Sequence, residues 1–300
     1  MPHPHDKQVF YKYLSGNVTK LVLESATFQW SAPALFNDPF DHQASYRFDF
    51  DEDQAADHLA KALEEIVFGA SDPVFEEDKE LGRKFAQMRG RIPDQSKDRA
   101  IYAMKQSAKA SASRLGKYKI DLNATLLGLL SQARVLCVSE THDNVVMWSH
   151  YADCHKGVVL ELGRFNEVED NLLAAKPVEY VEQFPLFMSV ENWIDYLTGK
   201  TRIHDDILYR PAFAKHVDWR YEKEWRVWIP AIGPGWGTTG RTLLSKDRRV
   251  FTGLYFGCRV DPEVKAQLLA IAATAYPEMK IYQAHVAADS FQLVFERQFN

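Results

Sequence analysis

The spacing of hydrophobic residues changes character twice along the chain. Residues 8–14 and 18–25 are short runs rich in β-branched and aromatic side chains, and they predict two strands. From residue 51 to about residue 134, apolar side chains recur at intervals of three and four, which predicts three or four helices. After residue 134 the short apolar runs return. We therefore expect strands on both sides of one helical block.

The second half of the chain holds most of the predicted strands. They cover 134–139, 157–162, 177–181, 219–230, 250–257, 280–286 and 291–299. Helices are predicted at 143–153, where Asp143 is the expected N-cap, at 191–216 and at 262–275. Because strands outnumber regular strand–helix–strand units, we predict an α+β fold with a mixed, mostly antiparallel sheet, whole or split. Residues 1–300 are expected to form one domain, with the helical block 51–134 inserted into the sheet or flanking it.

Composition narrows the classes of function. The chain of 300 residues is 46% hydrophobic with a net charge of −5, which fits a protein with a sizeable core and argues against one that coats nucleic acid over its whole surface. Its three cysteines are widely spaced, its first residues are polar, and no run reaches the roughly 18 apolar residues of a membrane span. We expect a cytoplasmic protein with no membrane association.

One stretch departs from the overall acidity. Residues 96–119 contain seven Lys or Arg and one Asp. Such a run is either a solvated helix face or a surface that docks nucleic acid or an acidic partner. The sequence leaves both readings open.

The predicted strand 219–230 places four charged side chains on one face. Side chains alternate along a strand, so Arg220, Glu222, Glu224 and Arg226 point the same way, while the other face is mainly aromatic and aliphatic. The charged face is either solvated and self-compensating, or it forms the wall of a cleft in which the arginines keep the carboxylates ionised.

Two further segments have side chains suited to a site. Ser139 and Glu140 end a predicted strand, where chains often open onto clefts. In the helix that follows, Trp148 and Tyr151 are either core residues or ligand contacts, and His150 lies on a different side of that helix.

The loop at 31–42 is the third candidate segment. Asn37-Asp38-Pro39 has strong turn chemistry, and the loop is either a rigid structural turn or presents Asn37, Asp38 and Asp41 to a ligand. No metal is expected, because the sequence has no HExxH motif.

Taken in order, these segments resemble the bacterial domain-of-unknown-function family 2971. The similar stretches are FYKYL at 10–14, LFNDPFD at 35–41, CVSE at 137–140, MWSHYADCHKGVVLEL at 147–162 and WRYEKEWR at 219–226, with Lys215 just upstream. The resemblance implies an uncharacterised bacterial protein, with a suggested role in phage defence.

The order of motifs also resembles a diverged ADP-ribosyltransferase. Those enzymes hold NAD in a split sheet, with a polar residue on the first strand, a Ser or Thr on a middle strand and Glu-x-Glu on a later strand. The counterparts here are Lys12 between Tyr11 and Tyr13, then Ser139, then Glu222-Lys223-Glu224. The first-strand residue is usually Arg or His, and the middle motif is usually Ser-Thr-Ser, so this chain departs at both.

The second resemblance implies an NAD-dependent transferase, acting as a defence or toxin effector. Glu224 would stabilise the oxocarbenium-like centre formed when nicotinamide leaves, and Glu222 would orient or deprotonate the acceptor. Tyr13 or Trp148 would stack on nicotinamide. The alternative is a non-catalytic module that binds a nucleotide or a partner as the sensor of a defence system.

Overall fold

The computed structural model describes residues 5–42, 45–77, 79–165, 168, 171–203, 205–230 and 240–298. The chain divides into two units, which we describe separately. The sheet unit consists of Met1–His42, Leu129–Glu182 and Ala212–Asn300. The helical unit consists of Gln43–Gly128 and Gln183–Pro211.

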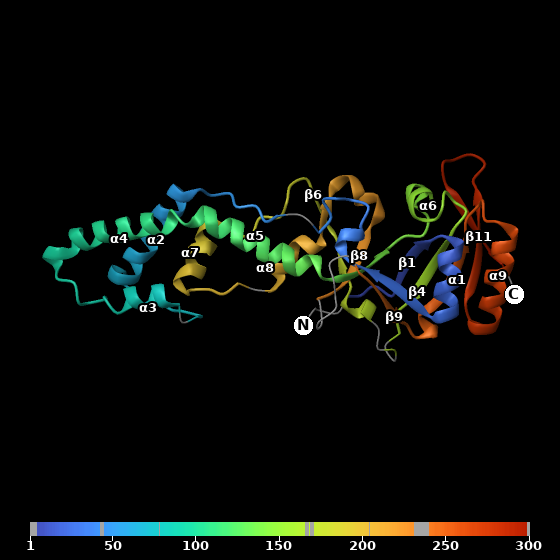
Figure 1. Ribbon diagram of the computed structural model, residues 1–300, viewed down its shortest axis with the longest axis horizontal. Helices are drawn as coiled ribbons and strands as arrows, with labels where there is room; N and C mark the ends of the chain where they lie inside the picture. The colour runs from blue at the N-terminus through green and yellow to red at the C-terminus, as the bar shows by residue number, and fades with distance from the viewer. Residues whose placement is uncertain are drawn as a thin grey trace. The chain divides into compact units, whose positions relative to one another are not determined.

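The sheet unit is built on a ten-stranded sheet, part of which is labelled in Figure 1. Its strands are β1 (Val9–Leu14), β2 (Thr27–Ser31), β3 (Arg134–Ser139), β4 (Val158–Gly163), β5 (Lys176–Pro177), β8 (Glu224–Ile229), β9 (Arg241–Ser245), β10 (Phe251–Phe256), β11 (Lys280–Val286) and β12 (Leu293–Gln298). Eight of them follow the order β12-β11-β10-β4-β1-β3-β2-β9, while β8 pairs with β3 and β5. Only β10 and β11 pair in parallel among the described strands of this sheet. The predicted α+β class with a mixed, mostly antiparallel sheet is confirmed.

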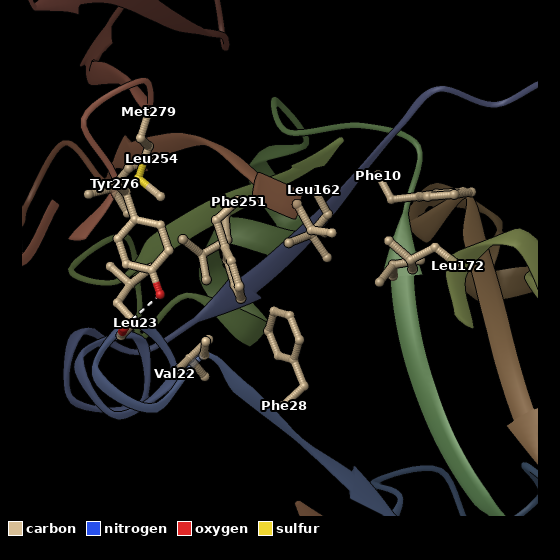
Figure 2. Packing of buried hydrophobic residues seen from close by; sticks show 14 of the residues in the cluster. Phe10, Val22, Leu23, Phe28, Leu162, Leu172, Phe251, Leu254, Tyr276 and Met279 are labelled. Carbon is tan, nitrogen blue, oxygen red and sulfur yellow. Dashed lines mark hydrogen bonds between the residues drawn. The ribbon is translucent and has the colours of Figure 1, made fainter. Parts of the chain in front are cut away.

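Helices cover the two faces of this sheet. On one face α1 (Gly16–Ser25) and α9 (Pro262–Ala275) lie side by side and pack on alternate residues of the central strands (Figure 1). Figure 2 shows this core, in which Leu23 of α1 meets Tyr276, whose hydroxyl donates to the Leu23 carbonyl at 2.6 Å. On the opposite face lies α6 (Val145–Tyr151). It buries Met147 and Trp148 against the strand residues whose side chains point to that face, including Tyr13 of β1.

A parallel pair of short strands, β6 (Glu179–Val181) and β7 (Ala214–His216), forms a second sheet in this unit. Short 3₁₀ helices complete the unit: η1 (Pro33–Leu35), η3 (Asn171–Ala174), η5 (Val217–Glu222) and η6 (Arg248–Val250). The segment η4 (Arg210–Phe213) begins in the helical unit and ends in the sheet unit.

The helical unit contains α2 (Glu52–Phe68), α3 (Glu80–Ala86), η2 (Asp94–Ser96), α4 (Lys97–Ala112), α7 (Val190–Thr198), α8 (Asp205–Tyr209) and most of α5 (Leu115–Ser131). Asp51 caps α2 in a reciprocal capping box with Gln54. The core forms where Leu59 and Leu63 of α2 meet Met104 of α4 and Trp193 of α7. Between residues 51 and 133 the described part of the chain contains helices and no strand, as the helical spacing predicted.

The predicted strand at 18–25 is wrong, because this segment belongs to α1. Ser15 caps that helix, and its buried residues, which include Val22 and Leu23, lie on one helical face. β-branched residues raise strand propensity, but burial of that face against α9 outweighs it. Strands β2 and β9 were not predicted.

The predicted strand 219–230 begins only at Glu224. Before it lies η5, and Lys223 has a left-handed backbone with φ 43°. The turn is held by the Ser139 hydroxyl, which donates to the Glu222 carbonyl at 2.6 Å, and by Glu140 N–H, which donates to the Lys223 carbonyl at 3.1 Å. Strand alternation therefore does not explain where Glu222 and Arg220 point.

Two helix predictions also need correction. The predicted helix 191–216 is several elements. Helix α7 ends at Thr198, where Gly199 caps it with φ 84°, and the segment finishes in β7. Asn144, rather than Asp143, caps α6, since its side chain accepts from the N–H groups of Val146 and Met147.

Candidate functional site

The main sheet splits between β1 and β3. One edge of β3 pairs with β8 along its length, whereas the other meets β1 at the single pair Tyr11–Ser139 and meets β2 at Val135. Between these two points, Lys12 takes the place of a neighbouring strand, and its Nζ donates to the Cys137 carbonyl at 2.6 Å. The split exposes main-chain groups of β3 to the space beside it.

A cavity of about 330 Å³ lies at this split. Its walls come from β1, β2, β3, the loop after β2, α6, β7, η5 and β8. The polar and aromatic lining residues are Tyr11, Lys12, Tyr13, Gln29, Ser31, Phe36, Asn37, Asp41, Cys137, Ser139, Tyr151, Lys215, Glu222 and Glu224.

Three of these residues stand in register on neighbouring strands. Tyr11 of β1 is paired with Ser139 of β3, and Ser139 is paired with Glu224 of β8. Directly paired residues point to the same face of a sheet. This is the face that α6 covers, because Trp225 and Val227 point into the core on the other side.

A buried ion cluster forms the floor beside Glu224. The Glu224 carboxylate accepts from Arg226 Nε at 2.8 Å and from Lys215 Nζ at 3.0 Å. Arg226 also makes a two-pronged contact with Asp41, at 2.8 and 2.6 Å. Lys215 donates to Glu222 and lies 4.8 Å from the centre of the Trp219 ring.

Burial makes this cluster an unusual electrostatic environment. Arg226 has no exposed surface, and the other four ionic members are at most 7% exposed. The cluster has three carboxylates, Asp41, Glu222 and Glu224, against two cations. Neighbouring His42 is buried, which lowers its pKa and keeps it neutral near pH 7. With all three carboxylates ionised, the cluster would carry a net charge of −1.

The pKa values of the three carboxylates in the cluster shift in different directions. Burial alone would raise the pKa of Glu224, but Arg226 and Lys215 hold that pKa well below its usual range. Arg226 likewise lowers the pKa of Asp41 against the effect of burial. At Glu222, burial and the nearby charge of Glu224 prevail, and its pKa is raised. The site thus pairs one firmly ionised glutamate with one that holds a proton more readily.

Residues 147–227 match the sequence model of the family described as protein of unknown function, DUF2971. No curated protein and no solved structure matches the chain. The predicted DUF2971 resemblance is confirmed for this segment, whereas no comparison links the chain to ADP-ribosyltransferases. None of the described helices is long and apolar enough to cross a membrane.

The DUF2971 segment supplies only part of the cavity. It includes Met147, Tyr151, Lys215, Glu222 and Glu224. The remaining lining residues, on β1, β2, β3 and the loop after β2, precede it in the chain. Among the described residues, no group of three or more His, Cys, Asp or Glu is arranged to hold a metal ion.

The loop after β2 and helix α6 meet at the mouth of the cavity. The Tyr151 hydroxyl donates to Glu222 at 2.5 Å, and Asn37 Nδ2 reaches the same hydroxyl at 3.5 Å. At the other end of the loop, Asp41 is held by Arg226. Both ends of this segment are therefore tied to the ion cluster.

Several predicted site residues do not line the cavity. Trp148 is fully buried and its indole N–H donates to the His142 carbonyl, so it is not placed to stack on a ligand there. Asp38 caps its own turn through Phe40 N–H, and Glu140 accepts from Trp225 and pairs with Lys7. His150 and Arg220 are exposed, and Arg226 lies behind the cavity wall.

Some cavity residues were missed from the sequence. Cys137 lies two residues before Ser139 on β3, so strand alternation already put both on one face. Gln29 and Ser31 were missed because β2 was not predicted. No sequence signal linked Asp41 to Arg226, which is 185 residues away.

The raised pKa of Glu222 predicts a specific pH dependence of stability. Above the ordinary glutamate pKa of about 4.3, the folded state keeps a proton on Glu222 that the unfolded chain has lost. Stability from this group is full below that pH and is lost as the pH rises through the folded pKa. Urea unfolding from pH 4 to 8 should therefore show Glu222→Gln gaining stability relative to wild type as the pH rises. A constant or falling difference would contradict the assigned direction.

Proposed function

We propose that the cavity binds NAD and that the protein transfers ADP-ribose from it. The observation that carries this proposal is the register of Tyr11, Ser139 and Glu224 across three neighbouring strands at a split in the sheet. Those strands bear the three motifs that suggested a diverged ADP-ribosyltransferase. The partly exposed ring of Tyr11 lines the cavity and supports stacking on nicotinamide, whereas Tyr13 is 6% exposed and packs edge-on against Trp148.

The two glutamates suit the two halves of the reaction. The bond between nicotinamide and ribose breaks, and its electron pair leaves with nicotinamide. Glu224, held ionised by Arg226 and Lys215, opposes the positive charge that develops on the ribose. The acceptor then forms its bond to the ribose, and its proton passes to Glu222. The pKa of Glu222 is raised, whereas that of Glu224 is lowered. Such a divergence between two neighbouring carboxylates is typical of a pair in which one moves a proton and the other stays ionised.

Incubation with NAD tests this function directly. Wild-type protein should release nicotinamide, and Glu222→Gln should impair transfer to an added acceptor more than it impairs hydrolysis to free ADP-ribose. The reason is that Glu222 acts on the acceptor side of the reaction. Chromatography of nicotinamide and ADP-ribose measures both rates. Glu296→Gln is a matched control, because Glu296 is exposed on β12 of the same sheet.

One observation favours a second function, a non-catalytic nucleotide-binding module. Both Glu224 oxygens already accept from Arg226 or Lys215, so a ribose hydroxyl reaches this carboxylate only if a cation yields. Isothermal titration separates the two functions. Binding of NAD without any release of nicotinamide would support the module, and wild-type protein that neither binds nor consumes NAD would end both proposals for this ligand.

A further inference from the structure

The basic segment of the helical unit forms an exposed face on α4 and the start of α5. Six cationic side chains are exposed there: Lys97, Arg99, Lys105, Lys109, Arg114 and Lys117. The opposite side of α4 buries Met104 and Ala108 in the core, and α4 lies beside α2 (Figure 1). The position of this face in the fold is therefore fixed by packing. Its cations are exposed, and Lys97 also lies over the Phe68 ring at 5.3 Å.

Several other cations of the helical unit form ion pairs. Lys79 pairs with Glu77 at 2.8 Å, Lys84 pairs with Glu80 at 2.5 Å, and Arg89 pairs with Asp72 at 2.9 Å. None of the six side chains on the α4 face forms an ion pair with any residue that the structure describes. Asp98 is the single acidic residue between residues 97 and 117, so this segment has a strong excess of cations. Such an excess attracts a polyanion, and the attraction does not depend on the net charge of the whole chain.

Tyr102 adds an aromatic group to this face. It is 64% exposed, and Lys105 and Lys109 follow it three and seven positions along the helix, so the three side chains share one side of α4. No other large hydrophobic side chain is strongly exposed between residues 97 and 117. The face thus lacks the apolar anchors of a protein–protein hot spot, but it has the cations and stacking ring typical of nucleic-acid binding.

We propose that this α4 face binds single-stranded nucleic acid. Lys105 and Lys109 contact successive phosphates, and the Tyr102 ring stacks on a base. An acidic protein segment would satisfy the cations but would not use the exposed ring. This binding is independent of the proposed reaction with NAD, and its test contains no NAD.

Fluorescence anisotropy with a labelled single-stranded oligonucleotide tests the proposal on the full chain. The double variant Lys105→Ala with Lys109→Ala should bind about tenfold more weakly at 0.1 M salt, and the slope of log affinity against log salt should become shallower by about 1.4. The matched control is Lys61→Ala with Lys84→Ala, which removes the same charge from exposed positions on α2 and α3. The control should bind like wild type.

Two further comparisons identify the occupant. Tyr102→Leu should weaken single-strand binding about tenfold while leaving binding to a duplex of the same sequence nearly unchanged. Polyglutamate at equal charge concentration should displace the oligonucleotide far less well than unlabelled nucleic acid. The proposal is overturned if wild type does not bind at 0.1 M salt, if both double variants lose binding equally, if Tyr102→Leu has no effect, or if polyglutamate competes as well as nucleic acid.

Discussion

Replacing Glu224 with glutamine is expected to slow the release of nicotinamide from NAD by a factor of about 10² to 10³. Glutamine keeps the size and hydrogen-bonding reach of the side chain but removes its charge. The Glu224 carboxylate is only 6% exposed and is held ionised, so its charge is well placed to oppose the developing cation. Initial rates of nicotinamide release, measured by chromatography, provide the test.

The same substitution should also affect stability, so folding needs its own control. Glu224 is 6% exposed and sits between Arg226 and Lys215, whose charges it offsets. Removing one partner of a buried ion pair costs about 3 to 5 kcal/mol, and the amide oxygen of glutamine should recover part of that. Rates should be compared below the melting temperature of the variant, with Glu296→Gln alongside. A folded Glu224→Gln protein with wild-type turnover would remove Glu224 from the mechanism.

Replacing Arg226 with methionine should lower the free energy of unfolding by about 3 to 5 kcal/mol, because Asp41 and Glu224 would remain buried without their main counter-charge. Methionine keeps much of the side-chain volume, so little of the loss should come from a cavity. Urea unfolding followed by circular dichroism measures the effect.

A double-mutant cycle separates this charge effect from general damage to the core. Asp41→Asn alone should be destabilising, but in the Arg226→Met background it should cost clearly less, because the partner charge is already gone. The expected coupling lies in the range of about 0.5–3 kcal/mol found for residues that share a buried network. Strictly additive effects of the two substitutions would show that the Asp41–Arg226 contact does not link the loop after β2 to the site.

The candidate site could be anticipated in part because some of its signals are local. Glu224 and Arg226 lie on one face because side chains alternate along β8, and Met147 and Tyr151 both line the cavity because they are four apart on α6. The charged face was not recognised as buried, because burial depends on the elements that cover a strand. Here Asp41 and Lys215 cover it, and both come from outside the strand.

The sequence alone also determined where several elements begin and which class of fold they build. Helical spacing marks α2, and the runs at 250–257 and 280–286 become β10 and β11. Each of these features depends on residues a few positions apart, so the physics that creates it is visible in a short window of sequence.

Only the tertiary structure decided that residues 16–25 form a helix, that β3 is left unpaired along part of one edge, and that Arg226 binds Asp41 across 185 residues of chain. The physical reason is the same in each case. Helix and strand propensities act between residues close in the sequence, and the propensities of different residue types differ by about 1 kcal/mol or less per residue. The burial of a helix face or the pairing of two buried charges involves several kcal/mol and depends on which distant segments meet, so it overrides the local preference.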